Sequence, residues 1–117
     1  MMNKEFKKGS IILVDFGETT ECTGSVQKGR RPAMVLGSIK NSNKLTVVPL
    51  TSKMKRVDSF NHVMINKGEG NLKMDSMALV EDITTVSCEQ IGCYIGFVSH
   101  MILQRINIAI TKMLSLD

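Results

Sequence analysis

Aromatic residues are scarce in this sequence, which contains no tryptophan, one tyrosine and four phenylalanines among its 117 residues. Proteins that bind single-stranded nucleic acid by base stacking, such as those with RNA recognition motifs, carry several aromatic side chains on one surface. The composition therefore disfavours a stacking platform of that kind. With 43% hydrophobic and 22% charged residues, the sequence is otherwise typical of one globular domain, here expected to cover residues 1–117.

Cysteines and long apolar runs are also few. Cys22, Cys88 and Cys93 form an odd set without a Cys-x-x-Cys spacing, and neither histidine stands at a metal-ligand spacing from them. We therefore expect reduced thiols and no zinc site. The apolar run 11–14 ends at Asp15, which is too short for a secretory signal, and no stretch approaches the ~20 apolar residues of a transmembrane helix. These absences predict a cytoplasmic protein that makes no contact with a membrane.

The motifs of several enzyme classes are missing. The sequence has no Gly-x-Ser-x-Gly elbow, no His-Glu-x-x-His motif, no P-loop and no Gly-x-Gly-x-x-Gly fingerprint. The Gly-x-Gly at 68–70 is typical of an ordinary loop, and the carboxylates are too scattered to predict a magnesium site. A reaction that needs neither metal nor cofactor is the enzymatic interpretation that remains.

Charge is distributed unevenly along the chain. Residues 1–56 contain eleven Lys or Arg and four Asp or Glu, whereas residues 57–117 contain four and seven, so the net +4 is a first half of +7 and a second half of −3. Such asymmetry favours a localised basic surface and an anionic partner. The alternative is that folding mixes the two halves and leaves scattered, solvated charges.

Apolar and turn residues predict short strands followed by one helix. A hairpin is expected over 33–50 with its turn at 41–43, and 67–71 is expected to be a flexible loop. The expected strands cover 11–16, 32–36, 45–50, 62–65, 77–86 and 91–98, the fifth interrupted by Glu81 and Asp82. This order predicts a mainly β fold, a small antiparallel barrel with an appended helix.

The helix is expected over 100–115, with Ser99 as its N-cap. Apolar residues at helical spacing form one face, and others widen the apolar surface well beyond that face. Two explanations stay open: the helix packs deeply on its own barrel, or it forms the seam of a homodimer. The first face consists of Ile102, Ile106, Ala109, Ile110 and Met113, and the wider surface adds Met101, Leu103, Ile108 and Leu114.

Two segments, 24–32 and 49–53, hold the residues best suited to chemistry. The first is a glycine-containing loop that leads through Arg31 into a strand, and the second ends a strand with Thr51. Because the hairpin joins these strands, its outer ends should bring the two residues together. A guanidinium beside a hydroxyl makes a phosphate clamp. The alternative is a structural arginine paired with one of the carboxylates at 81–82.

Basic residues flank the proposed site of Arg31 and Thr51. They would bind phosphates without base specificity, so that affinity would fall with rising salt; alternatively, they are ordinary solvated charges. These residues are Lys28, Arg30, Lys53, Lys55 and Arg56.

Segments 24–32 and 46–53, in this order and at this separation, resemble the toxin family named for MazF, PemK and Kid. The similarity extends over most of the chain, and the closing helix sits where the family has one. Further matching stretches are 8–11, 31–36, 60–63 and 75–79.

The resemblance implies an SH3-like barrel of the CcdB/PemK type with a C-terminal α-helix, which forms a homodimer. It implies an endoribonuclease toxin of a bacterial toxin–antitoxin system that cleaves single-stranded RNA, including mRNA, at short sequences and so inhibits translation and growth. No metal is needed, because the ribose 2′-hydroxyl attacks the adjacent phosphorus and leaves a 2′,3′-cyclic phosphate and a 5′-hydroxyl. On this sequence, Arg31 would stabilise the phosphorane charge and Thr51 would hydrogen-bond the scissile phosphate.

The resemblance suggests further site residues. Glu81 falls where relatives of the Kid branch carry a carboxylate implicated as base, which makes it a secondary catalytic candidate. Val26 stands where many members have glutamate, and Asp82 replaces a frequent glutamine, which bears on base recognition. The residues expected to contact RNA are Ser25, Gln27, Lys28, Arg30 and Lys53.

The implied partners are single-stranded RNA, a second copy of the chain, and a cognate antitoxin whose acidic, disordered tail covers the basic groove. Operator DNA would be contacted only through the antitoxin. Two non-catalytic interpretations remain open: a gyrase poison of the CcdB type, and a catalytically silent relative, which Val26 motivates. An RNase needs Arg31 and Thr51 together in a basic groove, whereas a gyrase poison does not.

Overall fold

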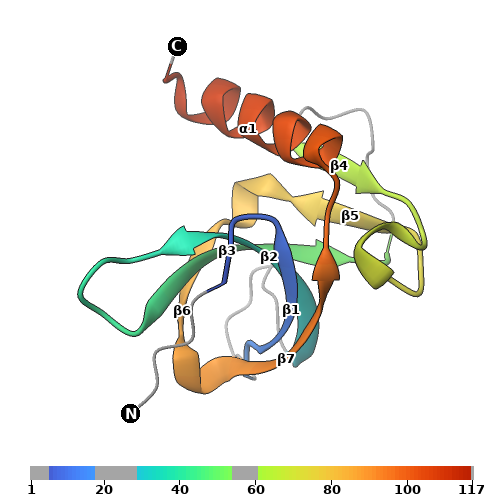
Figure 1. The fold of residues 1–117 in the computed structure, drawn as a ribbon. Coiled ribbons are helices and arrows are strands. Elements are labelled where there is room, and N and C mark those ends of the chain that lie inside the picture. Colours follow the sequence, from blue (N-terminus) through green and yellow to red (C-terminus); the bar gives the residue numbers. More distant parts are fainter. Residues whose placement is uncertain (1–5, 18–28, 54–60, 117) are drawn as a thin grey trace.

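Short strands dominate the fold, and one long helix closes the chain (Figure 1). The computed structural model describes residues 6–17, 29–53 and 61–116. The strands in these ranges are β1 (Ser10–Asp15), β2 (Arg30–Ser38), β3 (Lys44–Thr51), β4 (His62–Ile65), β5 (Ser76–Leu79), β6 (Thr84–Ser87) and β7 (Ile91–Phe97). The helices are α1 (His100–Leu114) and the short 3₁₀ helices η1 (Glu69–Asn71), η2 (Val80–Asp82) and η3 (Cys88–Gln90).

Strand β3 lies at the centre of the sheet. All pairs among the described strands are antiparallel, in the order β4-β5-β3-β2-β1-β7, and β6 also pairs with β3. One edge of β3 pairs with β2, while the other edge pairs with β6 near Leu45 and with β5 near Leu50. Strand β3 therefore belongs both to the group β4-β5 and to the group β6, β2, β1 and β7, and the sheet curves on itself around it. The expected mainly β barrel with a C-terminal helix is confirmed (Figure 1).

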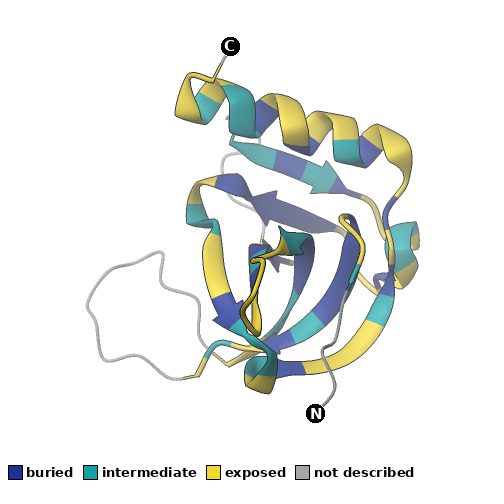
Figure 2. Cartoon of the chain, turned by 60° about the vertical axis from the view of Figure 1, so that its left-hand side comes forward, coloured by how far each residue is buried: buried dark blue, intermediate teal, exposed yellow. Residues whose placement is uncertain are grey.

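The central parts of β1, β2 and β3 are buried (Figure 2), and their side chains pack into two separate cores. In β1, Ile11 belongs to a core that α1 covers, whereas Ile12 and Val14 belong to a second core inside the barrel. Strands β2 and β3 alternate likewise, with Met34, Val48 and Leu50 in the first core and Ala33, Val35, Leu45 and Val47 in the second. Each of the larger side chains among them contributes about 1.5–3 kcal/mol through burial, so these two cores hold the hairpin that carries Arg31 and Thr51.

Helix α1 packs on the barrel through one face. Ser99 caps its N-terminus by accepting a hydrogen bond from the Ile102 backbone N–H at 3.4 Å, as its position predicts. Ile102, Ile106 and Ala109 are buried against the barrel. Three residues of the wider apolar surface remain more than half exposed: Met101, Ile108 and Leu114. Packing on the barrel therefore accounts for one face of the helix only, and the homodimer seam stays a prediction. No helix in the described ranges is long and apolar enough to span a membrane.

The strand expected over 77–86 is interrupted at Glu81 and Asp82 as predicted, but the interruption is the 3₁₀ helix η2, which divides it into two separate strands, β5 and β6. Ala78 pairs with Leu50 and Thr84 pairs with Val47, so an advance of six residues from Ala78 to Thr84 matches only three residues of β3. The three extra residues are accommodated as the turn of η2 between β5 and β6. The expected loop at 67–71 also contains regular structure, because η1 forms there and packs against β7.

Candidate active site

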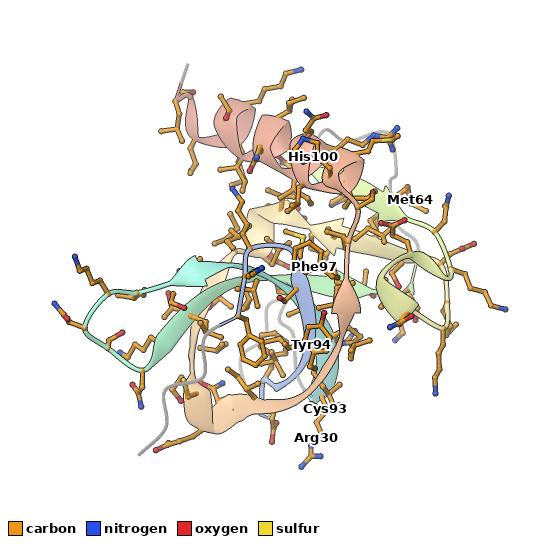
Figure 3. The ribbon with its side chains drawn as sticks, viewed as in Figure 1. Arg30, Met64, Cys93, Tyr94, Phe97 and His100 are labelled. Carbon is orange, nitrogen blue, oxygen red and sulfur yellow. The ribbon has the colours of Figure 1, made fainter. Side chains whose placement is uncertain are left out.

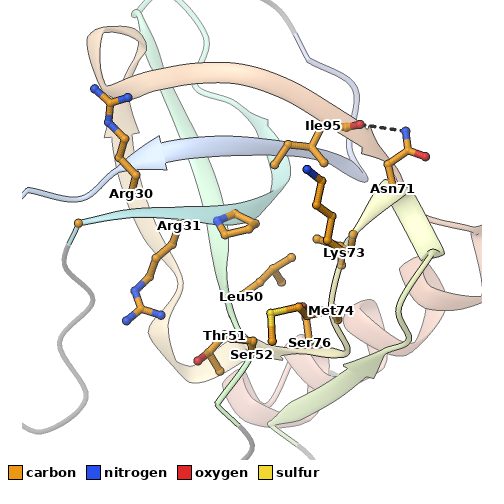
Figure 4. Close-up of a pocket in the computed structure, with 13 residues that line it drawn as sticks. Arg30, Arg31, Leu50, Thr51, Ser52, Asn71, Lys73, Met74, Ser76 and Ile95 are labelled. Atoms are coloured by element: carbon orange, nitrogen blue, oxygen red, sulfur yellow. Dashed lines mark hydrogen bonds between the residues drawn. The ribbon is translucent and has the colours of Figure 1, made fainter.

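A pocket of about 530 Å³ opens where β2 begins and β3 ends, with the segment between η1 and β5 on its far side (Figure 4). This volume lies within the ~300–1,000 Å³ typical of small-ligand sites. The lining residues are Gly29, Arg30, Arg31, Pro32, Leu50, Thr51, Ser52, Asn71, Leu72, Lys73, Met74, Ser76 and Ile95.

Arg31 and Thr51 face each other across the β2–β3 ladder. Ala33 stands opposite Pro49, and continuing this register by two residues sets Arg31 opposite Thr51. Both residues line the pocket, and Figure 4 shows their side chains on the same side of it. The hairpin thus brings the two residues together, as its turn at 41–43 predicts.

The Thr51 hydroxyl is held in a defined position. Thr51 is 5% exposed, and its Oγ1 accepts a hydrogen bond from the Lys53 backbone N–H at 3.1 Å. A hydroxyl that accepts one bond still has its own hydrogen to donate. Thr51 can therefore donate to a phosphate oxygen in the pocket, which is the role that the family resemblance implies.

The charged side chains that line the pocket in the described residues are all cationic: Arg30, Arg31 and Lys73. Arg30 is exposed at the start of β2, where it pairs in register with Asp15 of β1, at the end of the molecule remote from α1 (Figure 3). Lys53 is exposed directly after β3 but is not a lining residue. A pocket with this lining favours an anionic ligand.

Several residues that the sequence suggested lie outside the described ranges. Among the expected RNA contacts, these are Ser25, Gln27 and Lys28, and among the other residues discussed, Val26, Lys55 and Arg56. Their contribution to RNA binding stays a prediction.

Glu81 is not brought to this pocket. It belongs to η2, and its Oε2 accepts a hydrogen bond from Nε2 of His62 at 2.9 Å. The His62 side chain is 10% exposed and the Glu81 side chain 38%. His62 lines a different, shallower hollow between β4 and α1. The structure therefore joins Arg31 with Thr51 but leaves the secondary candidate Glu81 elsewhere.

Sequence reasoning missed the residues that complete the pocket from the far side. Asn71, Lys73 and Met74 come from the segment that leads from η1 into β5. They reach the pocket because β5 pairs with the last residues of β3, setting Met77 opposite Thr51. No motif or spacing signals this contact, since more than twenty residues separate the partners along the chain.

No group of three or more His, Cys, Asp or Glu side chains that could hold a metal ion occurs among residues 6–17, 29–53 and 61–116. Cys88 and Cys93 are both present as thiols, the latter exposed. Among the lining residues that the structure describes, the charged and hydroxyl-bearing side chains offer guanidinium, ammonium and hydroxyl groups for chemistry.

Comparison with known proteins identifies the family. Residues 7–114 match the model of the PemK-like, MazF-like toxins of type II toxin–antitoxin systems. The chain belongs to this family.

Individual relatives agree with this assignment. The endoribonuclease MazF of Staphylococcus saprophyticus is 26% identical over 113 residues, which cover 94% of this chain and 92% of that protein. The fold is similar to that of MazF from Deinococcus radiodurans, with a TM-score of 0.76 and 18% identity over 96% of this chain and 98% of the other. The Mycobacterium tuberculosis toxin MazF-mt6 superimposes with a TM-score of 0.71 and 19% identity, covering 92% and 98% of the two chains.

Proposed function

We propose that this protein is a metal-independent endoribonuclease that cleaves single-stranded RNA. The observation that carries the proposal is the register that sets Arg31 opposite Thr51 in a pocket with cationic lining. The family supports it, since the Staphylococcus saprophyticus relative is named an endoribonuclease. Cleavage of mRNA by such an enzyme would inhibit translation and growth.

The reaction is a transesterification at phosphorus. The ribose 2′-oxygen bonds to the adjacent phosphorus and loses its proton, while the bond to the 5′-oxygen breaks and that oxygen gains a proton. The products are a 2′,3′-cyclic phosphate and a 5′-hydroxyl. Negative charge grows on the non-bridging oxygens in the transition state, and positioned donors in a shielded pocket stabilise it.

Arg31 and Thr51 fit the two supporting roles. A guanidinium is permanently charged and presents paired N–H donors, so Arg31 suits electrostatic stabilisation of the phosphorane better than proton abstraction. Thr51 donates its hydroxyl hydrogen to a non-bridging oxygen, with its orientation set by the Lys53 N–H. Glu81, hydrogen-bonded to His62, stays a candidate from resemblance alone.

The toxin would be controlled by a cognate antitoxin. A mycobacterial structural neighbour is an endoribonuclease solved with its cognate antitoxin, and MazF from Deinococcus radiodurans is solved with MazE. An acidic, disordered tail would compete with RNA for Arg30, Arg31 and Lys73. We further propose a homodimer that acts in the cytoplasm and reaches operator DNA only through the antitoxin.

The test is incubation of purified protein with a long natural RNA in excess EDTA, followed by mapping of the new ends. We expect cleavage at short recurrent sequences, 5′-hydroxyl ends that polynucleotide kinase can label without prior phosphatase treatment, and loss of cleavage in Arg31→Ala. Full cleavage by Arg31→Ala would overturn the role of Arg31. Absence of cleavage by the unmodified protein on any RNA would favour a gyrase poison or a silent relative.

A further inference from the structure

The far side of the pocket is a wall built from residues 69–76, and its base is anchored on strand β7. Gly70 of η1 and Gly96 of β7 cross so closely that a Cβ added to Gly96 would lie 2.1 Å from the Gly70 carbonyl oxygen. Gly70 has a φ of 61°, a left-handed conformation that favours glycine. This wall therefore rests directly on the β7 backbone.

Side-chain hydrogen bonds hold the rest of the wall in place. The Asn71 Nδ2 donates to the Ile95 carbonyl oxygen at 3.0 Å, at the upper right in Figure 4. The Ser76 hydroxyl donates to the Met74 carbonyl oxygen at 3.0 Å, and the Asp75 carboxylate accepts from the Lys67 backbone N–H at 2.7 Å. Bonds on both sides of Lys73 thus fix the backbone that carries it.

Lys73 stands across the pocket from the proposed clamp. Figure 4 shows the Lys73 side chain on one side and Arg31 on the other, with Leu50 between them. The described lining offers no carboxylate to neutralise Lys73. Apolar side chains of Leu50, Met74 and Ile95 line the space between the cations. A cavity of about 530 Å³ with cations on two sides suits one nucleotide unit flanked by its phosphates.

We propose that Lys73 binds a second phosphate of the RNA strand, adjacent to the scissile phosphate that Arg31 and Thr51 hold. The base between the two phosphates lies on the apolar lining of Leu50, Met74 and Ile95. Lys73 is thus a positioning residue that sets the register of the strand over the clamp. This inference rests on the proposed endoribonuclease function and adds the path of the RNA strand, which runs across the pocket from Arg31 and Thr51 to Lys73.

The experiment measures binding of a short RNA that contains the mapped cleavage site, with a 2′-deoxy substitution at the attacking ribose to prevent cleavage. Each phosphate is replaced in turn by a neutral methylphosphonate. For the unmodified protein we expect weaker binding at two positions, the scissile phosphate and a neighbour. For Lys73→Ala we expect about tenfold weaker binding of the fully charged RNA and a salt dependence whose log–log slope is smaller by about 0.7. Replacing the neighbouring phosphate by a methylphosphonate should then cause no further loss of affinity. Lys73→Arg should restore the sensitivity.

Lys40→Ala is the matched control, because Lys40 is an exposed lysine in the turn between β2 and β3, outside the pocket. It should keep both sensitive positions and the original slope. If Lys73→Ala behaves like Lys40→Ala while the unmodified protein still cleaves RNA, the role of Lys73 is overturned and the proposed function stands. If the unmodified protein neither cleaves nor binds RNA, the proposed function fails and the role of Lys73 fails with it.

Discussion

Gly96 of β7 lies directly against the Gly70 carbonyl oxygen of η1, which is 2.1 Å from the point where any larger residue at position 96 would place its Cβ. The contact joins η1 to β7, two segments that line the same pocket through Asn71 and Ile95. We expect Gly96→Ala to lower the free energy of unfolding by about 1–3 kcal/mol, since overpacking against backbone cannot relax by a rotamer change. RNA affinity should fall with it, because the wall that carries Lys73 must shift.

Urea denaturation and RNA binding would measure both effects. Gly37→Ala is the control, because nothing lies within 4 Å of its added Cβ and its change should stay within about 0.5 kcal/mol. Equal stability and equal RNA affinity for the two variants would show that the crossing of Gly70 and Gly96 is unimportant.

Thr51→Val should lower the single-turnover cleavage rate by about a hundredfold to a thousandfold, which is the range for loss of one donor to developing oxyanion charge. Valine has a similar shape but cannot donate to the phosphate or accept from the Lys53 N–H. Thr51→Ser retains the hydroxyl and should lose less than Thr51→Val. A Val variant that cleaves as fast as the Ser variant would remove the hydroxyl from the mechanism.

Glu81→Gln should retain cleavage to within about threefold, because Glu81 bonds His62 outside the pocket. The free energy of unfolding should change by less than about 1 kcal/mol, since the Glu81 side chain is 38% exposed and solvent screens the pair. Cleavage kinetics and thermal unfolding would be compared with His62→Ala. A hundredfold loss of rate in Glu81→Gln alone, with stability unchanged, would instead support the catalytic role that the family resemblance implies for Glu81.

Ile108→Glu should convert the proposed homodimer to a folded monomer. Ile108 is 55% exposed on α1, so a charge there does not disturb the core, but it would be desolvated in a seam between two helices. Sedimentation velocity gives the oligomeric state and circular dichroism verifies folding. Asn107→Glu changes a polar exposed neighbour on α1 and serves as the control. If Ile108→Glu sediments as the unmodified protein does, the seam does not involve this side of the helix.

The predictable parts of the site come from local structure. The turn at 41–43 joins β2 and β3 into a hairpin, so Arg31 and Thr51 at its outer ends come close together, while a register shift between Val35 and Gly37 decides which residues stand opposite each other there. Likewise, α1 follows from Ser99 and the spacing of its apolar residues, which are interactions within a few residues of chain. Such interactions can be deduced without knowing where the rest of the molecule lies.

The position of Glu81 illustrates the opposite case. Its match to a carboxylate of the Kid branch suggested a catalytic role. Between β5 and β6, however, the chain has three more residues than pair with β3, and these residues form η2. That turn presents Glu81 to His62, nineteen residues earlier in the chain. The spacing of residues in the sequence does not predict this contact between Glu81 and His62, because the turn depends on where β5 and β6 pair with β3.

The sequence by itself determined the mainly β fold with its closing helix, the proximity of Arg31 and Thr51 at the outer ends of one hairpin, and a basic first half of the chain. Tertiary structure alone decided that Lys73, from the acidic second half, completes the cationic pocket. The physical reason is that β3–β5 pairing and the Gly70–Gly96 crossing join distant segments through backbone contacts that leave no periodic signal in the sequence.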